Sequence, residues 1–274
     1  MNNLIILLIA IFPVFVIAFY VYKKDRDKES KRLLAKLLFY GMLSCIPAVI
    51  LELKVGALFG PEESMDMVTK FFYIFFSIAL VEEGCKWFFV YRIAYNNHEF
   101  DHIYDAIVYS VFVSLGFALF ENIFYVFLGG ITTGLLRAIT AVPGHAINGI
   151  LMGEYLGLAK KHDLNKNNGP KRAAFFLSLF MPTLTHALYD YCLLTANMTL
   201  LVVFLFYLIY LYIYSFKTIK KVSKVPNNLR ERPIIKRPIS REIPNNLYCP
   251  KCKEYKRVGK YCNNCGNPLI KINN

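Results

Sequence analysis

The stretch "IALVEEGCKWFFV", residues 78–90, places two adjacent glutamates and a lysine inside a run of aromatic and aliphatic residues. At 100° per residue, Glu82, Lys86 and Glu83 lie at about 0°, 40° and 100° around a helix, so they share one face. A charge at the centre of a bilayer costs about 2.5–3.5 kcal/mol even on lenient scales. We therefore expect this face to point into a helix bundle or a wet cavity and not at lipid.

The composition of the whole chain is that of a membrane protein. Of 274 residues, 56% are hydrophobic and 19% are charged, and the mean hydropathy is +0.39. A soluble domain is less apolar and carries more charge. The first apolar run lacks the basic start and the small-residue cleavage site of a secretory signal, which favours a retained first helix.

Apolar segments predict an all-α polytopic membrane protein with about seven transmembrane helices in a domain of residues 1–216. Pro143 and Gly144 fall in the middle of the fifth segment and indicate a kink or a break, so counts from six to eight stay open. The segments are residues 4–22, 33–51, 71–92, 103–128, 131–159, 173–195 and 198–216.

The basic residues predict an orientation. Residues 23–32 hold six Lys/Arg, residues 159–172 hold five, and four lysines follow closely after Phe216, whereas residues 52–70 hold two lysines and four acids. Seven crossings put every Lys/Arg-rich loop on one side, which should be the cytoplasm. We expect the N-terminus outside and the C-terminus in the cytoplasm.

The tail carries nearly all of the net charge. Residues 217–274 contain 15 Lys/Arg and 3 Asp/Glu, against a formal charge of +13 for the chain. Because the tail directly follows a membrane helix, it is more typical of a segment held against anionic lipid than of a nucleic-acid-binding segment. Within it, residues 217–247 contain several prolines amid charges and predict an extended, semi-rigid linker.

Four of the seven cysteines form two CxxC pairs, Cys249 with Cys252 and Cys262 with Cys265. Two such pairs suit a tetrahedral Zn²⁺ site, and a reducing cytoplasm disfavours disulfides. We therefore predict a structural zinc ribbon over residues 248–268, which could hardly fold without a metal. Four sulfur ligands leave that zinc no open position for catalysis. Docking of a cytoplasmic protein partner is one expected use.

Further polar side chains interrupt the later apolar segments. They are Glu121 and Asn122 in "GFALFENIFY", His145 and Asn148 in "AVPGHAING", and His186 and Asp190 in "PTLTHALYD". Counted from the predicted outer ends at 1.5 Å per residue, the glutamates and histidines lie roughly 12–20 Å below the membrane boundary. A shared depth predicts that they surround one cavity.

Carboxylates and imidazoles in one cavity permit two kinds of hydrolysis. A glutamate acts as general base on water while a histidine stabilises the oxyanion or protonates the leaving group. Alternatively, Glu and His hold a catalytic metal that activates water. The sequence has no HExxH helix, the usual zinc-protease signature, and it leaves this choice open.

Four motifs carry a resemblance to a known family. "EEGCK" matches EExxK, "FALFE" (117–121) matches FxxxE, "HALYD" (186–190) matches HxxxD, and His145 in "PGHAINGILMGEYLG" fits a further histidine-bearing helix. In this order, over about residues 70–195, the chain resembles the PrsW family of prokaryotic membrane proteases. That family is similar to the CAAX prenyl endopeptidases and their bacterial relatives.

The resemblance implies an intramembrane or membrane-proximal endopeptidase in a prokaryotic cell membrane, with anti-sigma factors as the model substrates. It implies that one glutamate of the EExxK motif activates water and that the lysine positions or neutralises the other. The implied catalytic residues are Glu82, Glu83, Lys86, Glu121, His145, His186 and Asp190. The relatives with prenyl substrates have a histidine where this chain has Glu121, so their mechanism does not transfer directly.

Two other classes of function use the same residues differently. In an ion-coupled transporter or channel, the carboxylates and histidines relay protons or bind a cation, although the sequence has one broken segment and no internal repeat. In a membrane-anchored sensor or scaffold, the ribbon and the basic linker recruit a partner. The intramembrane charges of Glu82, Glu83 and Lys86 also suit a structural ion pair.

Overall fold

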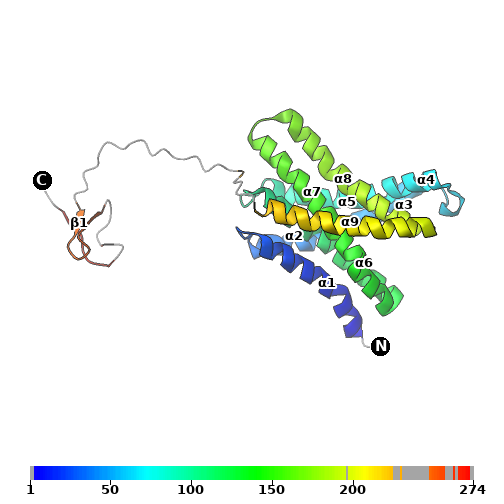
Figure 1. Ribbon diagram of the computed structural model, residues 1–274, viewed down its shortest axis with the longest axis horizontal. Coiled ribbons are helices and arrows are strands. Elements are labelled where there is room, and N and C mark those ends of the chain that lie inside the picture. Colours follow the sequence, from blue (N-terminus) through cyan, green and yellow to red (C-terminus); the bar gives the residue numbers. More distant parts are fainter. Residues whose placement is uncertain are drawn as a thin grey trace. The chain divides into compact units, whose positions relative to one another are not determined.

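The computed structural model describes residues 3–195, 197–224, 229, 247–256, 262 and 265–271. The chain divides into two compact units, residues 1–230 and 231–274 (Figure 1). The first unit consists of α1 (Asn3–Lys24), α2 (Lys31–Leu43), α3 (Cys45–Gly56), η1 (Glu62–Ser64), α4 (Met67–Tyr73), η2 (Ile74–Ala79), α5 (Leu80–Val90), η3 (Tyr91–Tyr95), α6 (Ile103–Ile139), α7 (Ala141–Leu164), α8 (Asn168–Leu194) and α9 (Met198–Val222). The second contains β1 (Leu247–Cys249), β2 (Glu254–Lys256) and β3 (Ile270–Lys271).

The helical unit is apolar outside and charged inside. Large side chains such as Phe12, Leu128 and Phe206 are exposed, whereas Glu83 and Lys86 are fully buried. An apolar surface of this extent is typical of a protein whose surroundings are lipid.

Four described stretches are long and apolar enough to cross a membrane. They are Leu7–Lys24, Lys31–Gly56, Ile103–Leu164 and Met198–Val222. The third of these contains both α6 and α7. Seven crossings stay a prediction, because α5 and α8 hold the intramembrane charges and fall outside these stretches.

The helices α6 and α7 are interrupted at two places, Gly130 and Thr140. Helix α6 bends sharply at Gly130, whose φ of 73° lies in the left-handed region that glycine adopts readily. Residues 131–139 then turn back along the preceding part of α6, where Arg137 donates to Asn122. Pro143 lies in the first turn of α7, where a missing N–H costs no hydrogen bond. The fifth predicted segment therefore does break into two pieces, but at Thr140, three residues before Pro143, and not in mid-helix at the proline.

Helix α6 is the centre of the bundle and packs against α7, α1 and α2. Its approach to α2 depends on two glycines that face each other. A Cβ added at Gly41 would overlap the carbonyl oxygen of Val113, and one added at Gly116 would overlap that of Leu38. Small residues at such crossings let membrane helices come close enough for backbone contact.

We expect Gly41→Ala to lower the stability of the helical unit. The added methyl group pushes α2 away from α6, and overpacking of this kind typically costs about 1–3 kcal/mol. Gly84→Ala is the matched control, because its Cβ meets nothing within 4 Å. Thermal unfolding in detergent should show a lower midpoint for the first variant and an equal or higher midpoint for the second. Equal midpoints for Gly41→Ala and the parent chain would contradict the close crossing.

The helix that carries the EExxK motif is not a uniform α-helix. The π-helical segments η2 and η3 precede and follow α5. Single π-helical turns inside helices occur frequently at functional sites, because the extra residue changes which side chains face inward. Helix α8 packs against both η2 and α5, so it meets the motif directly.

Helix α9 is longer than its predicted span of 198–216. It continues to Val222 and includes Lys217, Lys220 and Lys221. Lysines in a last helical turn interact favourably with the free carbonyl groups and the helix dipole. These residues therefore belong to the helix and not to the predicted linker, most of which lies outside the described residues.

Candidate active site

Lys86 lies between the two adjacent glutamates of α5. Its Nζ is 3.0 Å from Oε2 of Glu82 and 2.8 Å from Oε1 of Glu83, and it lies over the ring of Phe117. The (i, i+3) and (i, i+4) spacings let one ammonium reach both carboxylates, so Lys86 does not serve one glutamate alone.

Helix α8 brings His186 and Asp190 to the same carboxylates. His186 Nδ1 is 3.0 Å from Oε1 of Glu83, and its Nε2 is 3.3 Å from Oδ2 of Asp190 and 3.9 Å from Oε2 of Glu82. A carboxylate therefore faces each ring nitrogen. In its protonated form the ring donates Nδ1–H to Glu83 and directs Nε2–H toward Asp190 and Glu82.

Helix α7 contributes His145, which connects Lys86 to Glu121 of α6. Its Nδ1 is 3.2 Å from Nζ of Lys86, and its Nε2 is 2.8 Å from Oε2 of Glu121. An ammonium can only donate, so Nδ1 accepts and Nε2–H donates to Glu121. This tautomer is inferred from the hydrogen-bond partners. Both ring nitrogens of His145 are thereby engaged by protein.

Arg137 was not predicted as a site residue, but it reaches Glu121. Its Nη2 is 3.1 Å from Oε2 of Glu121, its Nε donates to Asn122, and its guanidinium lies 4.2 Å from the ring centroid of Tyr125. A lone arginine in the apolar run "ITTGLLRAIT" was the sequence signal for it. The backward turn after Gly130 is what brings it to the site.

Two more polar side chains belong to this region. Asn148 of α7 places its Nδ2 at 3.5 Å from Oε1 of Glu83. Glu52 of α3 lines the same cavity as the predicted residues. Sequence reasoning assigned Glu52 to a loop, because it could not foresee that α3 continues to Gly56.

A cavity of about 470 Å³ opens beside these groups. Five of the predicted site residues line it, namely Glu82, Glu121, His145, His186 and Asp190. Glu83 and Lys86 do not reach its wall: both are 0% exposed, whereas Glu82 is 7% exposed. The two adjacent glutamates therefore occupy different positions, one on the cavity wall and one beneath it.

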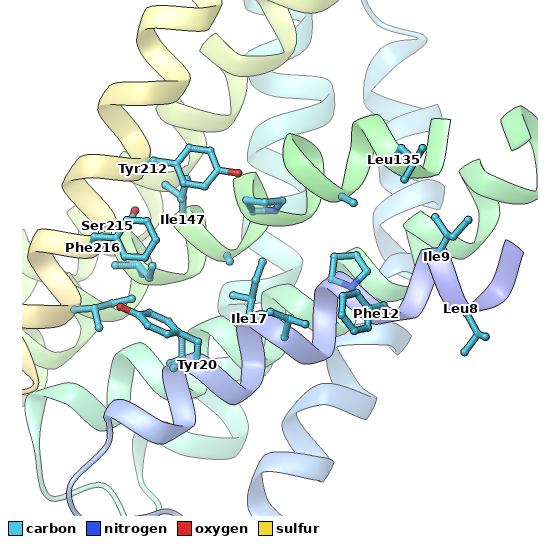
Figure 2. A pocket seen from close by; sticks show the side chains of 18 residues that line it. Leu8, Ile9, Phe12, Ile17, Tyr20, Leu135, Ile147, Tyr212, Ser215 and Phe216 are labelled. Atoms are coloured by element: carbon cyan, nitrogen blue, oxygen red, sulfur yellow. The ribbon is translucent and has the colours of Figure 1, made fainter. Parts of the chain in front are cut away.

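A larger hollow of about 820 Å³ lies between α1, α7 and α9 (Figure 2). It is almost entirely apolar, and Phe12, Ile17 and Tyr20 of α1 face Ile147 and Phe216 across it. Its α7 residues are not those that line the polar cavity. Among the described residues, no glutamate, aspartate or histidine lines it, so we do not expect hydrolytic chemistry there.

The four predicted cysteine ligands cluster in the second unit. Sγ of Cys249 is 3.6 Å from that of Cys265, Sγ of Cys252 is 3.8 Å from that of Cys262, and all four lie within 4.8 Å of one another. Tetrahedral ligands at about 2.3 Å from zinc are about 3.8 Å apart. Cys249, of the first CxxC pair, is the last residue of β1. This strand is the middle one of the antiparallel sheet β2-β1-β3, so the sheet holds the pair in place. The cluster could hold a metal ion.

The fold and the site define a class of protein. It is a helical membrane protein with a buried centre of carboxylates, imidazoles and one shared lysine beside a cavity. Residues 29–216 match a family model described as PrsW family intramembrane metalloprotease. The chain belongs to the PrsW family and is a membrane protease.

Individual relatives agree with this assignment. The chain is 37% identical over 188 residues to a protein named Protease PrsW from Oceanobacillus iheyensis, covering 69% of this chain and 82% of the relative. It is 32% identical over 216 residues to Protease PrsW from Bacillus subtilis, covering 78% and 94%. A third relative with this name, from Geobacillus kaustophilus, is 35% identical, covering 64% and 73%. No solved structure matches the chain.

The family description implies a metal, and the donors of the membrane site fit one. Each of Glu82, Glu83 and His186 offers one ligand atom, a carboxylate oxygen or a ring nitrogen, and the three atoms lie within 4.8 Å of one another. Oε2 of Glu83 is a buried carboxylate oxygen without a hydrogen-bond partner among the described residues. Carboxylate and imidazole are suitable ligands for a divalent metal.

Proposed function

We propose that the chain hydrolyses peptide bonds of membrane-anchored proteins in this cavity, with Glu82 as the base that activates water. The different positions of the two adjacent glutamates carry this proposal. Glu82 holds Lys86 through Oε2, and its Oε1 has no hydrogen-bond partner in the described part of the chain. Because Glu82 lines the cavity, a water molecule there can donate to it.

The reaction then needs an acid and donors for the oxyanion. Glu82 takes a proton from water as the water oxygen attacks the peptide carbonyl carbon. The negative charge that develops on the carbonyl oxygen is stabilised by N–H donors on the cavity wall, for which Asn148 and Arg137 are suitable. His186 directs Nε2 toward Glu82 and Asp190 and gives a proton to the leaving amine as the C–N bond breaks.

The remaining groups hold these reactants in place. Glu83 lies beneath the wall and binds both Lys86 and His186, so it positions the acid and the lysine. Glu121 fixes the ring of His145, which in turn accepts from Lys86. In the alternative mechanism, a divalent metal held by Glu82, Glu83 and His186 would supply a Lewis acid for the water and the carbonyl group, and these residues would then act as ligands and not as base and acid.

The expected seven alternating passes have support in contacts between helix ends. Lys160 near the end of α7 donates to the carbonyl of Tyr95 at the end of η3, and Tyr104 at the start of α6 donates to the carbonyl of Val21 near the end of α1. At the opposite end, Lys70 of α4 donates to the carbonyl of Leu194, the last residue of α8. We infer seven passes, with the N-terminus outside and the C-terminus in the cytoplasm.

A comparison of membrane-protein fragments tests the proposed function. Cells with the parent chain are compared with cells that carry the Glu82→Gln/Glu83→Gln double variant at equal expression. Fragments that depend on the two glutamates identify substrates such as anti-sigma factors and give the cleavage position. Identical fragment sets from both strains, with both proteins correctly inserted, would contradict the proposal.

We infer that the four cysteines of the tail bind one structural Zn²⁺. Lys253 and Gly266 follow the second cysteine of each pair and have φ of 55° and 70°, so both pairs end in the same turn. The matching turns and the sulfur spacing are typical of a zinc ribbon. We further infer that the basic tail lies against anionic lipid and that the ribbon docks a cytoplasmic protein partner.

Loss of this zinc should leave the membrane chemistry intact. We expect Cys252→Ser/Cys265→Ser to lose about one zinc per chain, since two ligands cannot hold the metal. The cleavage rate of a substrate bound through its membrane span should change less than twofold. Metal analysis of purified protein and a cleavage assay in proteoliposomes measure both quantities. Equal zinc content in variant and parent chain would contradict zinc binding by the four cysteines. Loss of cleavage in the variant would show that the membrane site depends on the zinc ribbon.

A further inference from the structure

Three buried carboxylates meet at an end of the helical unit, away from the proposed active site. Asp25 directly follows α1, Glu29 lies in the connection to α2, and Asp105 is in the first turn of α6. They are 6%, 5% and 1% exposed, and one oxygen of each lies within 4.8 Å of the others. Carboxylates this close repel one another unless a proton or a cation lies between them.

One oxygen of each carboxylate is also unsatisfied. Oδ2 of Asp105 accepts the N–H groups of Asp101 and His102, which closes the start of α6. Its Oδ1, Oδ2 of Asp25 and Oε2 of Glu29 are buried without a hydrogen-bond partner among the described residues. Buried polar atoms of this kind are few in native proteins, and each needs a proton, a water molecule or an ion as its partner.

Tyr109 provides a second, independent indication of a ligand beside these carboxylates. It lies one helical turn after Asp105 and is 0% exposed, and its hydroxyl neighbours the carboxylates of Glu29 and Asp105. This hydroxyl too has no partner of ordinary hydrogen-bond geometry in the described part of the chain. A fully buried neutral oxygen thereby lies beside two of the three acids. A phenol oxygen can serve as a cation ligand.

No lysine or arginine of the described residues forms an ion pair with these acids. The ammonium of Lys28 donates to the carbonyls of Tyr22 and Asp25 and lies over the Tyr22 ring. His102 approaches Asp105 only to 3.9 Å. The membrane site differs in this respect, because Lys86 and Arg137 offset its carboxylates.

We propose that Asp25, Glu29, Asp105 and Tyr109 bind a hard divalent cation, Ca²⁺ or Mg²⁺, that ties the end of α1 to the start of α6. All four donors are oxygen atoms, the ligands that Ca²⁺ and Mg²⁺ prefer. Zinc sites usually contain cysteine or histidine, and this cluster contains neither. Oxygen ligands at about 2.4 Å from Ca²⁺ lie at most about 4.8 Å apart, which agrees with the spacing of the carboxylates.

Thermal unfolding of the full-length protein in detergent tests this proposal. After removal of metals with EDTA, the midpoint is measured with increasing Ca²⁺ or Mg²⁺. We expect a saturable rise of at least about 5 °C at a cation concentration about a hundredfold above the dissociation constant. A midpoint that neither cation changes would overturn the proposal, as would one that rises only when the pH falls, since shared protons then satisfy the acids.

Matched variants locate the response. Glu29→Gln keeps the size of the side chain and removes one buried charge, so we expect a higher metal-free midpoint and no cation response. Tyr109→Phe should keep its metal-free midpoint and bind the cation several-fold more weakly. Glu63→Gln, an exposed acid on η1, and Glu82→Gln in the membrane site should respond like the parent chain. A full response in Glu29→Gln, or its loss in Glu82→Gln, would place the cation elsewhere and refute the site.

Discussion

Glu82→Gln should reduce the cleavage rate of a membrane-anchored substrate by about a hundredfold to ten-thousandfold, the range for loss of a general base. The amide keeps the size of the side chain but cannot accept the proton of water. Substrate affinity and membrane insertion should stay unchanged, because the substituted group acts on water and not on the substrate. Single-turnover cleavage in proteoliposomes, with enzyme in saturating excess over substrate, measures the chemical step.

The neighbouring glutamate provides the informative comparison. Glu83→Gln should also slow cleavage, but through His186 and Lys86, which it binds. Combining Glu83→Gln with His186→Gln should therefore cost much less than the product of the single effects, because the two residues act as a unit. Glu63→Gln on the surface of η1 serves as the control and should retain the parent rate. Normal cleavage by Glu82→Gln would contradict the proposal that Glu82 is the general base.

Lys86→Met should destabilise the helical unit by about 3–5 kcal/mol, the usual cost of removing one partner from a buried ion pair. Glu82 on the cavity wall and Glu83 beneath it would then lack the ammonium that they contact at 3.0 and 2.8 Å. The expected result is a lower unfolding midpoint in detergent and a lower yield of inserted protein. Lys54→Met, on the exposed side of α3, should leave the midpoint nearly unchanged.

A double variant separates charge from packing in this prediction. Lys86→Met/Glu83→Gln removes one buried carboxylate together with the lysine, so much of the lost stability should return. Cleavage should not return, since both positioning groups are gone. If the double variant unfolds as early as Lys86→Met alone, the lysine contributes through packing on Phe117 and not through its charge.

The membrane class and the site residues on single helices could be predicted from local pattern. Apolar length predicts membrane helices, and helical periodicity puts Glu82, Glu83 and Lys86 on one face. The same holds for His186 and Asp190, one turn apart on α8. The two CxxC pairs are equally local, since each places two thiols on one tight turn. Such features depend on residues a few positions apart.

Other features depend on how distant helices rotate and approach. Periodicity could not decide that Glu82 lines the cavity while Glu83 lies beneath it, because this depends on the π-helical turn before α5 and on the approach of α8. Arg137 reaches Glu121 only because the chain turns back at Gly130.

The sequence by itself determined that this is a helical membrane protein with charges inside the bundle and four clustered thiols, since hydropathy and spacing act over one or two helical turns. Only the tertiary structure decided that His186 of α8 meets Glu83 of α5, and that Asp25, Glu29 and Asp105 meet at one point. The physical reason is that such contacts join residues from separate helices, whose relative rotation is set by packing of the whole bundle.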